Sequence, residues 1–308
     1  MIQVINIIFP IFALIAAGYG CRKFGLLNEA ASVQINRFVI WLALPAQLFD
    51  FTSRHSMALT TNGGFILAFG GSAILIYLTS LIFYWYKHRS WGQASFYGLS
   101  ASYANTGYMG IPLCILALGE NSLGLAIIST LIVVCGLFSL AIIFIEAGLN
   151  AHHRWYEIIL TITKSILTNP LLLAPLIGAV LASQEMVLYV PFQNFLTLLA
   201  GAASPCALVA IGLFLAKKSD SPNKGLGLVI LMKLIVQPLI AWVIASPILH
   251  LSPVFIHAAV LLSALPTGTG PLMLAQYYET DGAFISRVVL LTTLGSLVNL
   301  SLILWWII

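Results

Sequence analysis

The sequence predicts an all-α integral membrane protein. Hydrophobic residue types make up 60% of its 308 residues, whereas Asp, Glu, Lys and Arg together make up 7%. A soluble globular protein carries roughly 25% charged residues, so this chain cannot build the hydrophilic surface that its length would require. The mean hydropathy of +1.03 agrees. The composition excludes a soluble enzyme, a disordered protein and a nucleic-acid-binding protein.

Apolar runs of membrane-spanning length recur along the whole chain. About 20 mostly apolar residues are needed to cross roughly 30 Å of hydrocarbon. Suitable runs lie at 2–20, 33–51, 63–86, 94–118, 122–145, 192–215, 226–248, 252–278 and 284–308. A tenth, at 166–182, is short and contains two prolines, so its crossing needs a separate argument.

The basic residues supply that argument. With ten spans, the loops on one side of the membrane contain Arg22, Lys23, Lys87, Arg89, Arg154, Lys164, Lys217, Lys218, Lys224 and Arg287, and those on the other side contain only Arg54. Without the short span, the bias would fall to six against five. Because cytoplasmic loops carry an excess of Lys and Arg, the sequence predicts ten spans with both termini on the periplasmic or extracellular side.

Residues 151–168 connect the two halves of the chain. Their polar members recur at steps of three and four, as Arg154, Glu157, Thr161, Lys164 and Thr168. This spacing predicts one polar stripe on an amphipathic helix in the cytoplasmic interface. A linker with one or two helical turns is the alternative.

The two halves, 1–150 and 169–308, are predicted to be inverted five-helix repeats, because an odd number of spans turns the second half over. Matched positions keep their order. At an offset of 160 they are Pro10 with Pro170, Gly18 with Gly178 and Pro45 with Pro205; at 161 they are Ser102 with Ser263, Thr106 with Thr267, Gly107 with Gly268 and Leu113 with Leu274. Inverted repeats are typical of secondary transporters.

The fourth and ninth spans are predicted to be broken helices. They contain the segments 104–112 (ANTGYMGIP) and 264–271 (ALPTGTGP), and Pro and Gly disfavour a continuous helix. Free N–H groups at the start of each second half would favour an anion, with side-chain donors from Asn105, Thr106, Thr267 and Thr269. Kinks that only allow close helix packing are the alternative.

Other residues within the spans are candidates for the same site. Pro45 and Pro205 are expected to kink helices that face the same cavity, or to kink them without ligand contact. An intramembrane Lys233 indicates a functional site. It would attract an anion or pair with a proton-carrying group, with snorkelling to the surface as the alternative. No Asp or Glu lies mid-span, so a cation site would need carbonyls or Asn299, Gln47, Gln237 or Gln276.

Several motifs resemble the auxin efflux carrier family, and the absence of a long hydrophilic middle loop resembles its bacterial branch. The motifs are Asn36-Arg37-Phe38-Val39, Leu42-Ala43-Leu44-Pro45, the segment 105–113 (NTGYMGIPL), Asn169-Pro170, Lys233-Leu234 with Pro238, and the segment 264–268 (ALPTG). The resemblance implies a two-domain, ten-helix carrier with broken helices that cross in spans 4 and 9. It also implies elevator-type movement, a homodimer and substrates such as malonate or malate. Asn105 and Pro266 would mark the crossovers. The second crossover has an extra Gly and Pro and no Asn, unlike the paired-Asn pattern of the plant carriers.

The sequence thus predicts a secondary active transporter of small organic anions in a bacterial inner membrane, with no enzymatic activity, cofactor or metal. The expected substrate-binding residues are Asn105, Thr106, Gly107, Pro266, Thr267, Gly268, Thr269, Pro45, Pro205 and Lys233. An exporter of auxin-like aromatic carboxylates, an anion channel and an intramembrane enzyme are the alternatives. Proton symport, uniport and efflux are all compatible with the sequence.

Overall fold

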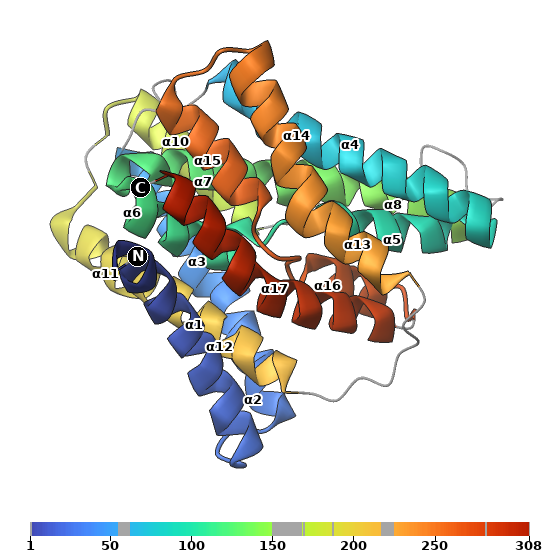
Figure 1. The fold of residues 1–308 in the computed structure, drawn as a ribbon. Helices are drawn as coiled ribbons and strands as arrows, with labels where there is room; N and C mark the ends of the chain where they lie inside the picture. The colour runs from blue at the N-terminus through green and yellow to red at the C-terminus, as the bar shows by residue number, and fades with distance from the viewer. Residues whose placement is uncertain are drawn as a thin grey trace.

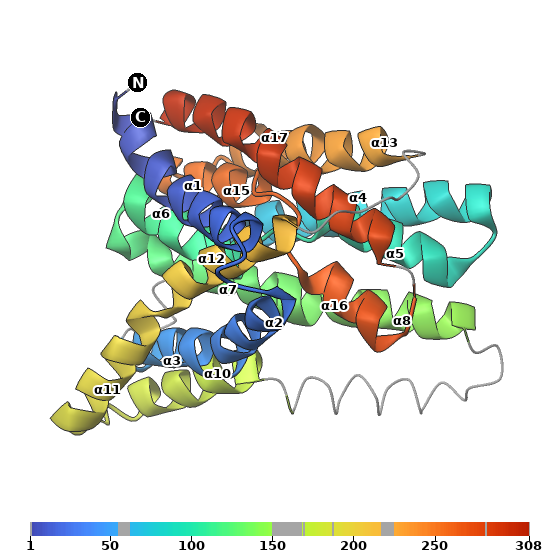
Figure 2. The same cartoon turned by 90° about the horizontal axis from the view of Figure 1, so that it is seen from below.

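A computed structural model describes residues 2–54, 62–149, 168, 170–186, 188–216, 225–280 and 282–307. These ranges are built of helices, with one isolated β-bridge. Figure 1 shows the helices crossing one another at oblique angles, and Figure 2 shows the same arrangement from below. The predicted interfacial helix lies outside the described residues except for Thr168.

Six stretches of the described chain are long and apolar enough to cross a membrane. They comprise α1 (Ile2–Lys23), α4 (Gly63–His88), α7 (Leu123–Leu131) with η5 (Ile132–Leu137) and α8 (Phe138–Leu149), α11 (Val190–Gly201) with α12 (Ala203–Leu215), α13 (Leu226–Leu231) with η6 (Met232–Val236), α14 (Gln237–Val243) and η7 (Ile244–Ile248), and α17 (Ala283–Ile307). The predicted all-helical membrane protein is confirmed at this level.

Shorter helices occupy the remaining apolar runs. They are α2 (Glu29–Phe38) with η1 (Val39–Ala43) and α3 (Leu44–Arg54), α5 (Trp91–Ser102), η3 (Thr106–Gly110) with α6 (Ile111–Leu118), η4 (Glu120–Ser122), α10 (Pro170–Ser183), α15 (Pro253–Ser263) and α16 (Gly270–Tyr277). Both segments that the sequence predicts to be interrupted are interrupted, at 103–105 and at 264–269.

Proline explains where several helices widen into π turns. The π segments η1, η3 and η6 each end two residues before a proline, namely Pro45, Pro112 and Pro238. A proline donates no hydrogen bond, and its ring clashes with the carbonyl four residues earlier. Over the preceding turn, the backbone therefore forms hydrogen bonds between residues five apart instead of four apart. In the seventh run, the junction between α11 and α12 lies three residues before Pro205.

Two glycines allow close helix–helix approaches around the first two runs of each half. A Cβ atom at Gly18 would lie 2.2 Å from the Val209 carbonyl oxygen, where α1 packs on α12. A Cβ atom at Gly178 would lie 2.2 Å from Thr52 Oγ1, where α10 packs on α3. Small residues permit such approaches between membrane helices.

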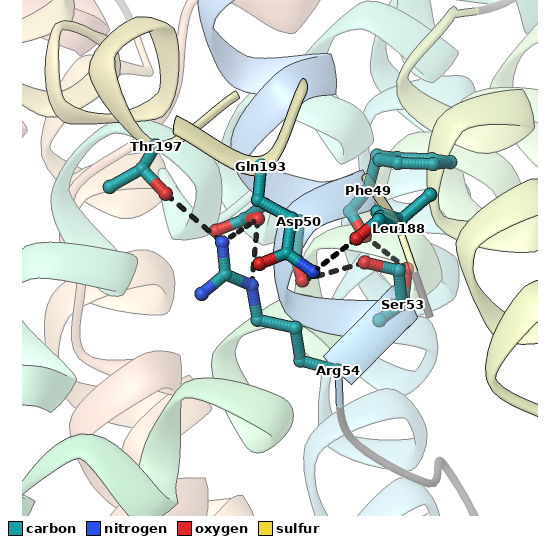
Figure 3. Close-up of polar contacts among 8 residues, drawn as sticks. Phe49, Asp50, Ser53, Arg54, Leu188, Gln193 and Thr197 are labelled. Carbon is teal, nitrogen blue, oxygen red and sulfur yellow. Dashed lines mark hydrogen bonds and ion pairs between the residues drawn. The ribbon is translucent and has the colours of Figure 1, made fainter. Parts of the chain in front are cut away.

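A polar cluster joins the end of α3 to α11 (Figure 3). Arg54 donates to Asp50 Oδ1 at 2.9 Å and to Thr197 Oγ1 at 3.0 Å. Nearby, Gln193 Nε2 donates to the Leu188 carbonyl at 2.8 Å. Because the Arg54 side chain is 41% exposed, its ion pair contributes at most about 1 kcal/mol. The cluster links α3 and α11 at the protein surface.

Candidate functional site

The two helix breaks meet in the structure. The backbone N–H of Asn105 donates to the Pro266 carbonyl at 3.0 Å, and the N–H of Gly268 donates to the Tyr103 carbonyl at 3.0 Å. These bonds form the antiparallel bridge between Ala104 and Thr267. The extended segments therefore satisfy part of each other's backbone, as non-helical chain at membrane depth must.

The carbonyl ends of α5 and α15 are also satisfied. Four carbonyls at these ends accept a hydrogen bond from a side chain of another segment. In a continuous helix, the backbone of the next turn would have bonded them. The donor–acceptor pairs are Thr267 Oγ1 to Ser100 O at 2.7 Å, Gln237 Nε2 to Ser102 O at 3.2 Å, Lys233 Nζ to Ser263 O at 2.7 Å and Asn299 Nδ2 to Ala264 O at 3.3 Å.

A cavity of about 140 Å³ lies beside the first break. Its wall includes Asn105, Thr106, Gly107 and Thr269 of the predicted site. The Asn105 side chain is 7% exposed and does not cap the helix that follows it. Within the described residues, its amide has no hydrogen-bond partner. A buried amide without a partner is costly, so this side chain is available to a solute in the cavity.

A larger cavity of about 640 Å³ adjoins the first and shares Ile40, Tyr108, Thr269 and Met273 with it. Among the described residues that line the two cavities, Arg37 is the one that carries a formal charge. Tyr108 stands where the cavities meet, and its hydroxyl donates to Asn36 Oδ1 at 2.7 Å. The wider cavity therefore presents a guanidinium, and no carboxylate, to a solute that approaches the break.

The other predicted site residues have different surroundings. Pro266, Thr267 and Gly268 form the backbone crossing. Pro45 is buried and Pro205 is exposed, and neither lines the two cavities. Lys233 is fully buried, so the snorkelling alternative is wrong. Its ammonium group lies at the carbonyl end of α15 and does not line the cavity.

Sequence reasoning missed the aromatic part of the site. Tyr103 lines the cavity, and a Cβ atom at Gly270 would lie 2.3 Å from its Cζ. The extra glycine of the second crossover thus makes room for this ring. The sequence does show an aromatic residue directly before Ala104. It does not show that this ring packs against residue 270, which is distant along the chain.

The sequence profile of the family described as "Membrane transport protein" matches residues 3–304. The chain belongs to this family. The family is that of the auxin efflux carriers, so the resemblance of the motifs is confirmed.

Three relatives match this membrane transport protein over nearly their full lengths. A Rhizobium meliloti (strain 1021) protein named "Putative malonate transporter" is 29% identical over 316 residues, which cover 100% of this chain and 97% of the relative. An uncharacterized transporter of Methanocaldococcus jannaschii is 25% identical, with 97% of each chain covered. Another, from Methanothermobacter thermautotrophicus, is 26% identical over 96% of this chain and 95% of its own.

Proposed function

We propose that this chain is a secondary carrier of small carboxylates and that it binds them at the first helix break. The observation that carries the proposal is the Asn105 amide, which is nine-tenths buried, lines the cavity and has no hydrogen-bond partner among the described residues. The side-chain hydroxyls of Thr106 and Thr269 lie in the same wall, also without a partner among the described residues. Such donors suit a carboxylate.

The charges around the cavities favour an anion. Arg37 is positive, no described lining residue is an Asp or Glu, and the helix that begins at Thr106 has its N-terminus at the cavity. Helix N-termini carry about half a positive charge. A cation would meet these groups without a compensating carboxylate, whereas a carboxylate would find donors at each of them.

The size of the inner cavity favours a small anion. At about 140 Å³, it is smaller than the roughly 300–1,000 Å³ pockets that hold drug-sized ligands. Malonate and malate are therefore better candidates than an aromatic carboxylate of the auxin type. The name of the Rhizobium meliloti relative points to the same substrate class.

The inverted-repeat topology is supported by equivalent contacts in the two halves. The first and seventh runs approach closely at Gly18, and the sixth and second runs approach closely at Gly178, which the offset of 160 pairs with Gly18. The N- and C-termini lie near each other in Figures 1 and 2, and an even number of crossings would likewise place them on the same side of the membrane. With the basic loops facing the cytoplasm, both ends would lie on the periplasmic side of a bacterial inner membrane.

Elevator-type movement is supported by where the inner cavity lies. One set of helices packs together around the contacts of α1 with α12 and of α3 with α10, and the other around those of α4 with α5 and of α14 with α15. The cavity wall takes Ile40, Leu44 and Leu171 from the first set and the first helix break from the second. Sliding one set past the other would move the break from one side of the membrane to the other. The homodimer that the resemblance implies stays a prediction.

The test is counterflow of radiolabelled malonate in proteoliposomes. Asn105→Ala should reduce it by roughly 10- to 150-fold, because a hydrogen bond to a charged group contributes about 1.5–3 kcal/mol. The matched control is Asn194→Ala, which removes the same amide from an exposed position on α11 and should behave like the wild type. Malate, succinate, lactate and indole acetate define the substrate class.

Two results would contradict the proposal. Native counterflow by a well-folded Asn105→Ala carrier would remove the first break from the site. Saturable transport confined to indole acetate would establish the aromatic alternative. A channel would give flux without counterflow, because it has no step in which one bound substrate exchanges for another.

A further inference from the structure

Lys233 is a basic side chain inside the membrane-spanning core. It has 0% exposure, and its Nζ donates to Ser263 O and to Gln237 Oε1, both at 2.7 Å. Two of its three possible donors are therefore satisfied by neutral oxygen atoms. An ionised group removed from water needs compensating negative charge, so the source of that charge has to be found.

No carboxylate of the described helices around Lys233 supplies it. The helical segments that pack against η6 or contact Lys233, namely α4, α5, α13, α14, α15 and α17, contain no Asp or Glu. The negative ends of two helices supply it instead. Ser263 is the last residue of α15, and Ser102, whose carbonyl accepts from Gln237 at 3.2 Å, is the last residue of α5. Each helix C-terminus carries about half a negative charge, so two of them together balance one ammonium.

This position has a known use in carriers with broken helices. There, the unwound carbonyls and the C-terminal ends of half-helices coordinate the coupling cation, while half-helix N-termini hold the anionic substrate. We propose that the Lys233 ammonium takes the place of a coupling cation at the helix crossing. The carrier then binds its anion without a sodium ion at this point, and the compensating charge stays with the protein in both directions of transport.

The oxygen atoms around Lys233 support this reading. The Ser263 carbonyl and Gln237 Oε1 already contact the ammonium, and Ser263 Oγ is buried without a hydrogen-bond partner among the residues that the structure describes. Removing the ammonium would leave an electronegative pocket of oxygen atoms, which a small free cation could occupy.

The first experiment measures thermal unfolding and needs no substrate, so its failure is distinguishable from failure of the proposed transport function. Lys233→Ala should unfold at a lower temperature than the wild type. Methylammonium chloride should raise that temperature, whereas choline chloride of equal concentration should not, because choline is too large for the vacated space. Lys233→Met fills the space without a charge and should show no rescue. Loss of stability without selective rescue in Lys233→Ala would overturn the proposal.

The second experiment measures malonate counterflow in proteoliposomes and remains informative if Lys233→Ala does not fold. The wild type should transport equally in sodium and in choline buffers, and a requirement for sodium would overturn the proposal. Lys233→Met should lose at least about tenfold, and wild-type counterflow by this uncharged variant would also overturn it. Where Lys233→Ala folds, methylammonium should restore most of its lost counterflow.

Discussion

The two helix breaks occupy matched positions in the two halves of the chain, yet they use their polar groups differently. At the first break, the Asn105 amide and the Thr106 hydroxyl have no partner among the described residues, and both residues line the inner cavity. At the second, Thr267 is fully buried, its hydroxyl donates to Ser100 O, and its N–H donates to Thr292 Oγ1 at 3.1 Å. The first break leaves the Asn105 and Thr106 side chains without described partners at the cavity, whereas at the second break Thr267 holds the crossing together and Thr269 lines the cavity.

This difference shows how two helix breaks in one chain can divide two tasks that are incompatible within one segment. A group that binds a solute must be free before the solute arrives, whereas a group that stabilises non-helical backbone in a membrane must be bonded at all times. In this chain, Asn105 stands at the first break, and the second break has no Asn. The departure from the paired-Asn pattern thus follows the division of tasks.

The largest effect is expected from a charge at the first break. Asn105→Asp replaces a donor by a carboxylate of the same shape, which would repel a bound anion and remove the hydrogen bond together. Malonate counterflow should fall by more than about 100-fold, further than in Asn105→Ala. Asn194→Asp on α11 is the matched control. Equal losses in Asn105→Ala and Asn105→Asp would mean that the ligand does not approach this side chain.

A stability effect is expected at the second break. Thr267→Val keeps the shape but leaves the buried Ser100 carbonyl without its donor. The free energy of unfolding should fall by about 1–3 kcal/mol, measured by denaturation of the purified carrier. Unchanged stability would show that the second break does not depend on this bond.

The matched substitution at the first break should lower substrate affinity and leave stability nearly unchanged. Because the Thr106 hydroxyl has no partner among the described residues, Thr106→Val should change stability by less than about 0.5 kcal/mol. Its malonate affinity, measured by concentration dependence of counterflow, should fall by roughly 5- to 10-fold. If Thr106→Val and Thr267→Val gave the same pair of changes, the comparison between the breaks would fail.

The smallest effect is expected for the contact between the first break and α2. Tyr108→Phe removes the hydrogen bond to Asn36, which joins the two sets of helices in the described conformation. One neutral bond contributes about 1 kcal/mol, so exchange rates should change by about fivefold with little change in affinity. Measuring the maximal counterflow rate and the half-saturating malonate concentration separately tests this prediction. A change in affinity alone would place Tyr108 in the binding wall instead.

The sequence predicted the helical membrane fold and the places where helices break, because both depend on local composition. Apolar runs fix the spans, and the Gly and Pro residues at 104–112 and 264–271 interrupt two of them. The sequence also predicted Asn105 as a binding residue. The roles of Thr106 and Thr267 could not be separated in this way, because their difference lies in partners that are distant in sequence, such as Ser100 and Thr292. Lys233 was ambiguous for the same reason.

The π turn at η1 ties the shape of the inner cavity to the length of the chain. Ile40 lies within this turn and Leu44 follows it, and both line the cavity. A π turn accommodates about one residue more than the α-helical turn it replaces. Deleting a single residue there would let this stretch close into an ordinary α-helical turn, which would keep the helix beyond it in register but would change the part of the cavity wall that Ile40 forms. The cavity wall at Ile40 therefore depends on the number of residues in this turn as well as on their identity.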